Sequence, residues 1–228
     1  MQNTLDSRAL HRADCYGQRF MKAGNFAYDV VPAGGVAISS DRPFSVKVRE
    51  GKAKGEMNQH NVVVTWHDGK FRAAPAALTV DTGDMVMWNC NQRDAMTLAV
   101  IGDQEFFNSS RLKNESGYSH AFGLPGEYRW VDAHGSKTSG MVTVKDPGCK
   151  NEAQLKRWRK TLEEGILVMI NDGKVEPSSV EIAVGQTVFF LVVNGPGISI
   201  TDARVVEYSR GDTGKAEGDR SSAKASAR

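Results

Sequence analysis

The chain has 228 residues, and its 29 Lys and Arg against 27 Asp and Glu give a formal net charge of +2. So small a charge provides no long-range field for nucleic acid or an anionic membrane, which argues against both partners. The length allows one large domain or two domains of about 100 residues. No stretch approaches about 18 uninterrupted apolar residues, so the sequence predicts no transmembrane segment.

The N-terminus and the cysteines bear on the cellular compartment. The opening stretch, MQNTLDSRALHRADCYGQRF, contains no apolar core of the kind that a secretory signal has, so the sequence as it stands predicts a cytoplasmic protein. Cys15, Cys90 and Cys149 lie far apart and form no CxxC pair. This spacing favours free thiols over a zinc site or a disulfide framework.

Residues 15–48 are predicted to form half of a β-sandwich. The stretch FMKAGNFAYDVVPAGG, residues 20–35, places Phe26 and Tyr28 two positions apart. Residues i and i+2 of a strand share one face, so the two aromatic side chains can fill one side of a core.

Residues 58–104 are predicted to form the complementary half. In TWHDGKFRAAPAALTVDTGDMVMW, residues 65–88, the Asp68-Gly69 dipeptide is typical of a hairpin turn. Leu78 and Val80 alternate with polar neighbours, as in a half-buried strand, and a glycine then precedes a second apolar strand.

Residues 105–146 repeat the first half. The stretch FGLPGEYRWVDAHGS, residues 122–136, resembles residues 20–35, with Tyr128 and Trp130 at the positions of the first aromatic pair. Internal similarity of this kind predicts a repeated structural unit.

The next segment is the strongest helix signal in the chain. Asn151, with a glutamine three residues later, resembles a capping box, and Gly165 suits the end of a helix. Leu155, Trp158 and Leu162 form one apolar stripe. The sequence predicts a linker helix near 151–164.

The last folded part, residues 165–206, repeats residues 58–104. The stretch MINDGKVEPSSVEIAVGQTVFF, residues 169–190, again contains Asp-Gly-Lys, a proline, an alternating strand and a glycine before an apolar strand. Residues 209–228 contain no apolar residue larger than Ala and cannot form a core, so we expect a disordered tail.

The order of the halves suggests two sandwiches, because a half-sandwich alone leaves a bare sheet face and open edges. We predict one continuous domain, 58–146, and a second domain assembled from 15–48 and 165–208. Segment 147–164 would link them. The second domain could close within one chain or between chains, and we favour closure within one chain.

The predicted continuous domain resembles the cupredoxin family of plastocyanin-like sandwiches. The similar stretches are PAALTVDTGDMVMWNC, FFNSSRLKNESGYSHAFGLPGEYRW and HGSKTSGMVTV. The resemblance implies an all-β fold made of Greek-key β-sandwich units. It also implies a blue copper site for electron transfer, which needs a thiolate, two imidazoles and a weak axial thioether.

Transferred residue by residue, the resemblance implies a degenerate copper site. Met96 stands where the family has its first histidine, and Asp132 stands where it has the thiolate. His134 is the remaining imidazole. Without the thiolate, ordinary blue-copper chemistry is excluded, although Asp132, His134 and Met96 could form a rebuilt site.

Three functions follow as hypotheses. The first is a copper-free structural or interaction subunit without a cofactor, which binds a protein partner or its own copies. The second is a copper protein for electron transfer or copper handling through the rebuilt site. The third is a small-molecule or carbohydrate-binding sandwich that uses Trp66, Trp88 and Trp130. No hydrolase or zinc-enzyme motif occurs, which favours a non-enzymatic role. The family is usually periplasmic, extracellular or lumenal, so the compartment stays open.

Overall fold

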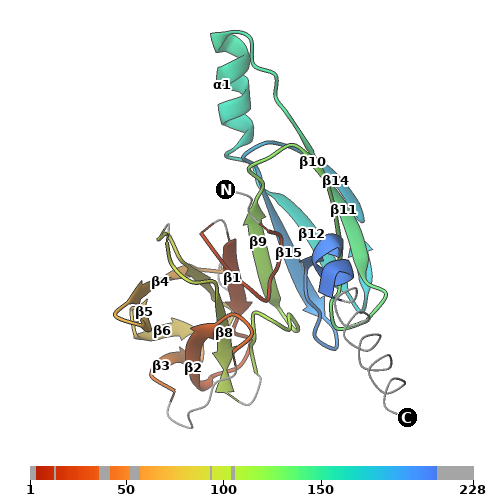
Figure 1. Ribbon diagram of the computed structural model, residues 1–228. Coiled ribbons are helices and arrows are strands. Elements are labelled where there is room, and N and C mark those ends of the chain that lie inside the picture. The colour runs from red at the N-terminus through yellow and green to blue at the C-terminus, as the bar shows by residue number, and fades with distance from the viewer. Residues whose placement is uncertain are drawn as a thin grey trace, which may run out of the picture.

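The computed structural model describes residues 4–12, 14–35, 42–51, 57–92, 94–103 and 106–209. These residues form two β-sandwiches that lie side by side, with strands β1 and β9 adjacent in the middle (Figure 1). The predicted all-β class is confirmed. Residues 210–228, the greater part of the predicted disordered tail, lie outside the described residues.

One eight-stranded sheet runs through both sandwiches in the order β13-β12-β15-β9-β1-β7-β4-β5. Its strands are β1 (Asp14–Arg19), β4 (Gln59–His67), β5 (Lys70–Ala74), β7 (Met85–Asn89), β9 (Ser116–Ala121), β12 (Ile166–Asn171), β13 (Lys174–Glu176) and β15 (Thr187–Asn194). Because β1 pairs antiparallel with β9, the sheet is continuous across the two halves of the chain.

Two four-stranded sheets complete the sandwiches, in the orders β6-β3-β2-β8 and β14-β11-β10-β16. The strands of the first are β2 (Gly24–Pro32), β3 (Phe44–Arg49), β6 (Ala77–Asp81) and β8 (Leu98–Gly102). The strands of the second are β10 (Gly126–Val131), β11 (Ser139–Lys145), β14 (Ser179–Ala183) and β16 (Thr201–Asp202).

The strand pairing differs from the predicted division into 58–146 and 15–48 with 165–208. Strands β2 and β3 pair with β8 and β6, so the N-terminal half-sandwich closes on residues 58–104. Strands β10 and β11 likewise pair with β16 and β14. Each half-sandwich therefore closes on the half that follows it in the chain. The repeats define which halves are complementary, but two equivalent partners exist for each half, and sequence similarity cannot choose between them.

The two sandwiches, here called unit 1 (β1–β8) and unit 2 (β9–β16), are copies of one design. Both Asp-Gly turns have positive φ, 51° at Asp68 and 48° at Asp172. The parallel pair of β4 and β7 in unit 1 corresponds to the parallel pair of β12 and β15 in unit 2. The internal similarity therefore reflects a repeated fold.

The seam between the units has an approximate twofold axis. Tyr16 and Tyr118 occupy equivalent positions in the two repeats, and they are also direct partners in the β1–β9 pairing. Directly opposite residues of an antiparallel pair point to the same side of a sheet. Both tyrosines are buried, so both four-stranded sheets cover the same side of the eight-stranded sheet.

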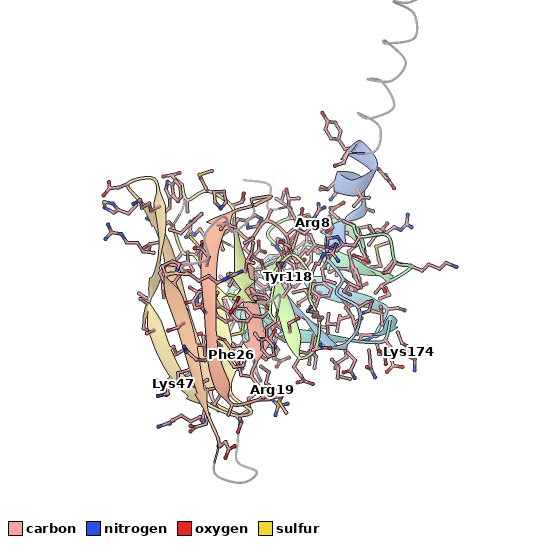
Figure 2. The ribbon with its side chains drawn as sticks, turned by 90° about the horizontal axis from the view of Figure 1, so that it is seen from below. Arg8, Arg19, Phe26, Lys47, Tyr118 and Lys174 are labelled. Carbon is pink, nitrogen blue, oxygen red and sulfur yellow. The ribbon has the colours of Figure 1, made fainter. Side chains whose placement is uncertain are left out.

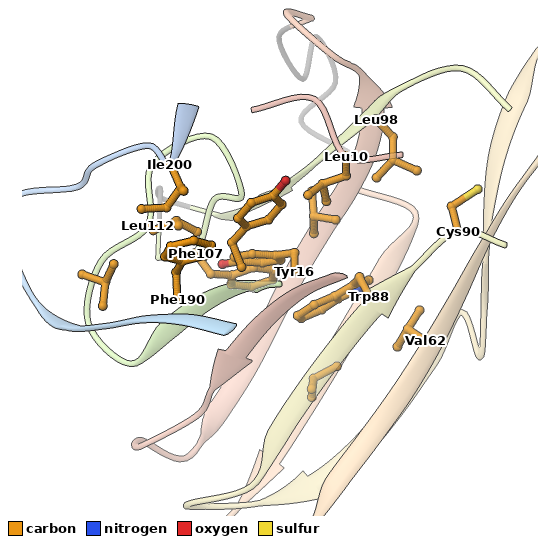
Figure 3. Close-up of a cluster of buried hydrophobic side chains, with 14 of the residues drawn as sticks. Leu10, Tyr16, Val62, Trp88, Cys90, Leu98, Phe107, Leu112, Phe190 and Ile200 are labelled. Carbon is orange, nitrogen blue, oxygen red and sulfur yellow. The ribbon is translucent and has the colours of Figure 1, made fainter. Parts of the chain in front are cut away.

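The core continues through the seam. Tyr16 stacks on Trp88 at 5.4 Å between ring centroids, and Trp88 stacks on Phe107 (Figure 3). In unit 2, Tyr118 stacks on Phe190 at 6.2 Å. Figure 2 places Tyr118 in the middle of the molecule. Aromatic side chains on both sides of one strand pair bury apolar area that belongs to neither unit alone.

Two segments outside the sheets join the four-stranded sheets to each other. In the N-terminal segment, Leu10 bridges to Leu98 of unit 1 and Asp6 bridges to Thr201 of unit 2. In the segment between β8 and β9, Asn108 and Leu112 make the corresponding bridges to Ile101 and Ile198. The second layer is therefore also tied together across the seam.

The predicted helix is α1 (Glu152–Thr161), which begins at the N-cap Asn151. It lies between β11 and β12, inside unit 2, and it projects from one end of the molecule (Figure 1). Trp158 anchors it by donating from Nε1 to the carbonyl of Val184 at 2.8 Å. A second helical stretch, 203–209, follows β16.

Candidate functional site

Asp132, the residue in the thiolate position, stabilises its own loop. The side chain is 4% exposed and accepts hydrogen bonds from the backbone N–H groups of Ser199 at 2.9 Å, His134 at 3.0 Å and Ser136 at 3.1 Å. Burial alone would raise the pKa of Asp132, but these hydrogen bonds outweigh it and lower the pKa. The carboxylate has little capacity left for a metal ion.

The other two residues of the rebuilt copper site do not complete it. His134 is exposed, and its Nε2 lies 2.7 Å from the carbonyl oxygen of Ser110. Met96 precedes β8 in unit 1 and is 47% exposed, whereas Asp132 and His134 lie in the β10–β11 loop of unit 2. This donor set, with no thiolate and a saturated carboxylate, does not fit a blue copper ion.

Of the three tryptophans named for ligand binding, Trp88 and Trp130 belong to the core. Trp88 and Trp130 are each 1% exposed. Trp66 packs edge-on against Phe71, with ring centroids 4.6 Å apart. The buried rings of Trp88 and Trp130 cannot stack on a sugar or a small-molecule ring, whereas Trp66 is half-buried.

A buried polar cluster lies instead at the seam between the two units. Asp14 on β1 faces His120 on β9, with 2.6 Å between Oδ1 and the imidazole Nδ1. The Tyr118 hydroxyl donates to the same Oδ1 at 2.8 Å. Burial, together with the charge of Asp14, raises the pKa of Tyr118, so the phenol keeps its proton and remains a donor.

His11 completes this seam cluster from the N-terminal segment. Its Nδ1 lies 3.0 Å from Asp14 Oδ2, and its backbone N–H donates to the same oxygen at 2.9 Å. One ligand atom from each of His11, Asp14 and His120 lies within 4.8 Å of the others, close enough to surround one metal ion. Two imidazoles and a carboxylate are a common ligand set for divalent transition metals.

The approximate twofold axis generates a sister site with different chemistry. There Gln18, Ser116 and Lys113 stand in the positions of His120, Asp14 and His11. The Lys113 N–H donates to Ser116 Oγ at 2.7 Å, as the His11 N–H donates to Asp14. The Tyr16 hydroxyl donates to Gln18, as the Tyr118 hydroxyl reaches towards His120. The same backbone is thus supported once by the side chains of Asp14, His11 and His120 and once by the side chains of Gln18 and Ser116 with the backbone N–H of Lys113.

The sequence did not predict the seam cluster, because its histidines lie in different repeats and show no metal-binding spacing. One signal was available. The match of residues 20–35 to 122–136 extends back to Tyr16 and Tyr118, so β1 and β9 are the same strand of the two copies. Strands related by a twofold axis commonly meet at that axis, which brings distant residues together.

Comparison with protein-family models, curated proteins and solved structures finds no match to this chain. The fold and the seam cluster therefore define the class that can be stated: an all-β protein of two sandwiches joined through one sheet. Among the described residues, no helix is long and apolar enough to span a membrane.

Proposed function

We propose that this chain is a copper-free, cupredoxin-like structural subunit that assembles with a second copy of itself. The saturated Asp132 and the separation of Met96 from His134 support the loss of copper. The observation that carries the assembly role is the outer face of the eight-stranded sheet, which no other sheet of the described residues covers.

The outer face combines exposed apolar side chains with uncharged polar ones such as Asn61 and Asn89. Alternation along the strands directs Val63, Leu167 and Met169 away from the core, and these side chains are 37%, 47% and 44% exposed. Partly buried side chains lie between them at the outward positions of the central strands: Cys15, Met87, Phe189, Leu191 and Val193. Contiguous apolar area of this kind marks a protein interaction surface.

Charge favours contact through this face over contact through the sheet edges. The six central strands consist of described residues. At their outward positions, Arg19 at the end of β1 is the one Lys, Arg, Asp or Glu. The edge strands carry Lys70 and Arg72 on β5 and Lys174 and Glu176 on β13. Charged edge strands resist pairing with further strands, whereas interface centres are depleted in charge.

The size and symmetry of the face suit a second copy of the chain. Eight strands about 4.8 Å apart, each about five residues long at about 3.3 Å per residue, cover roughly 650 Å². Two such faces bury about 1,300 Å², which reaches the range of stable protein interfaces. Because the sheet has an approximate twofold axis, two copies can stack face to face as a symmetric dimer.

The test is light scattering after size exclusion over a range of protein concentrations. We expect a dimer that a Leu167→Lys, Met169→Lys double variant converts to a monomer, since each lysine would have to be buried without a partner. Leu124→Lys, at a position 48% exposed in the β9–β10 connection, is the matched control and should remain a dimer. A wild-type chain that stays monomeric at every concentration contradicts self-association.

The absence of copper is tested separately by metal analysis after loading with Cu(I) and Cu(II). We expect no stoichiometric copper that depends on His134. Loss of one bound copper in His134→Ala, with His11→Asn unaffected, would overturn the copper-free assignment and make His134 a ligand. Copper lost only in His11→Asn would belong to the seam cluster.

A further inference from the structure

The contacts of the two His11 ring nitrogens are the starting point. Its Nε2 lies 3.0 Å from the carbonyl oxygen of Thr4, which only accepts, so this nitrogen is the one that carries the proton. In a neutral imidazole the other nitrogen is then an acceptor. Yet Nδ1 of His11 lies 3.0 Å from Asp14 Oδ2, a second acceptor. Only an additional proton or a metal cation between the two atoms makes this contact attractive.

The surroundings favour the cation. A second imidazole nitrogen, Nδ1 of His120, approaches the same carboxylate from the other unit. The Thr4 carbonyl orients His11 as outer-shell carbonyls orient metal-bound histidines. Tetrahedral zinc with bonds of about 2.0–2.1 Å needs ligand atoms roughly 3.3 Å apart. The two imidazole–carboxylate contacts, at 2.6 and 3.0 Å, lie close to this spacing, and one ligand atom from each of the three residues lies within 4.8 Å of the others.

The sister site shows that the fold does not need these ionisable groups. In the equivalent place, the Tyr16 hydroxyl donates to Gln18 and the Lys113 backbone N–H donates to Ser116. These hydrogen bonds involve no charged group. Burying Asp14 and His120, at 0% and 1% side-chain exposure, costs free energy that the sister site avoids. The seam cluster therefore has a role that the glutamine and serine of the sister site cannot fill. Metal binding is such a role.

We propose that His11 Nδ1, His120 Nδ1 and the Asp14 carboxylate bind a divalent zinc ion, with a water molecule as the fourth ligand. The His11 side chain is 21% exposed, which provides an entry path and a place for the water. The ligands come from the N-terminal segment, β1 and β9, so the ion would join unit 1 to unit 2. Its role is structural: it fixes the seam around which both sandwiches are built. This inference does not rest on the proposed dimer.

The test uses the full chain, stripped of metal with a chelator and titrated with Zn²⁺ alone by calorimetry. We expect one zinc ion per chain, release of protons on binding and an increase in the melting temperature of several degrees. Co²⁺ in place of Zn²⁺ should produce visible absorption typical of tetrahedral coordination.

Two variants decide whether the binding belongs to the seam. His11→Asn changes only the partly exposed ligand. The triple variant His11→Lys, Asp14→Ser, His120→Gln copies the sister site, so it preserves hydrogen bonding of a kind that the fold already accommodates. Both should lose the zinc, the cobalt spectrum and the thermal shift, while His67→Ala and His134→Ala, on the surface, should retain them. Absence of zinc binding in the wild-type chain, or binding that survives in His11→Asn, would overturn the proposal.

Discussion

At the scale of single residues, the buried carboxylate of Asp132 stabilises the loop in which it lies. Its two oxygens receive the backbone N–H groups of Ser199, His134 and Ser136. Asp132→Ala leaves these buried donors without an acceptor, which should reduce the free energy of unfolding by about 2–4 kcal/mol. Asp132→Asn keeps one acceptor oxygen and should lose about half as much. Urea unfolding measures both, and unchanged stability in the alanine variant would contradict this role.

The same residue predicts a pH dependence. Hydrogen bonds lower the pKa of Asp132 in the folded protein below the unfolded value of about 3.9, despite the opposing effect of burial. The unfolded chain therefore binds the proton more tightly. The stabilisation is complete above the unfolded pKa and is lost as the pH falls through the folded pKa. Asp132→Asn should show a smaller loss of stability than wild type as the pH falls below the unfolded pKa of about 3.9, measured by urea unfolding at each pH.

At the scale of elements, the sequence predicts the strands better than their partners. Alternation placed Leu78 and Val80, and the alternating strand within residues 169–190, on strands, and the Asp-Gly dipeptides placed both hairpin turns. These signals are local, because they depend on backbone conformation and on which face is apolar. Pairing is not local. Strand β3 could close on β6 or on its copy β14, and the two choices bury similar side chains in the same parallel geometry.

The candidate site follows the same logic. The resemblance to cupredoxins led to Asp132 and His134, which lie within one loop and are close in sequence. The seam cluster depends on contact between equivalent strands of two repeats, and only the pairing of β1 with β9 brings His120 to Asp14. A repeat predicts such contacts once the twofold axis is located, and Tyr16 opposite Tyr118 locates it.

At the scale of the whole molecule, the two sandwiches should unfold as one unit. They share the eight-stranded sheet, and the N-terminal segment bridges to Leu98 in unit 1 and to Thr201 in unit 2. Unfolding either unit would expose the aromatic seam and leave a bare edge on the other.

Buried tryptophans in each unit allow this to be measured. Trp88 reports on unit 1 and Trp130 on unit 2, so Trp130→Phe and Trp88→Phe, each made in a Trp66→Phe, Trp158→Phe background, isolate the two signals. Val62→Ala, in the core of unit 1, should cost about 2 kcal/mol and lower the melting temperature by roughly 4–8 °C. Because the seam couples the units, the Trp130 signal of unit 2 should shift by the same amount. If only the Trp88 signal moved, the sandwiches would be independent domains, and a metal ion at the seam would have little folding free energy to transmit between them.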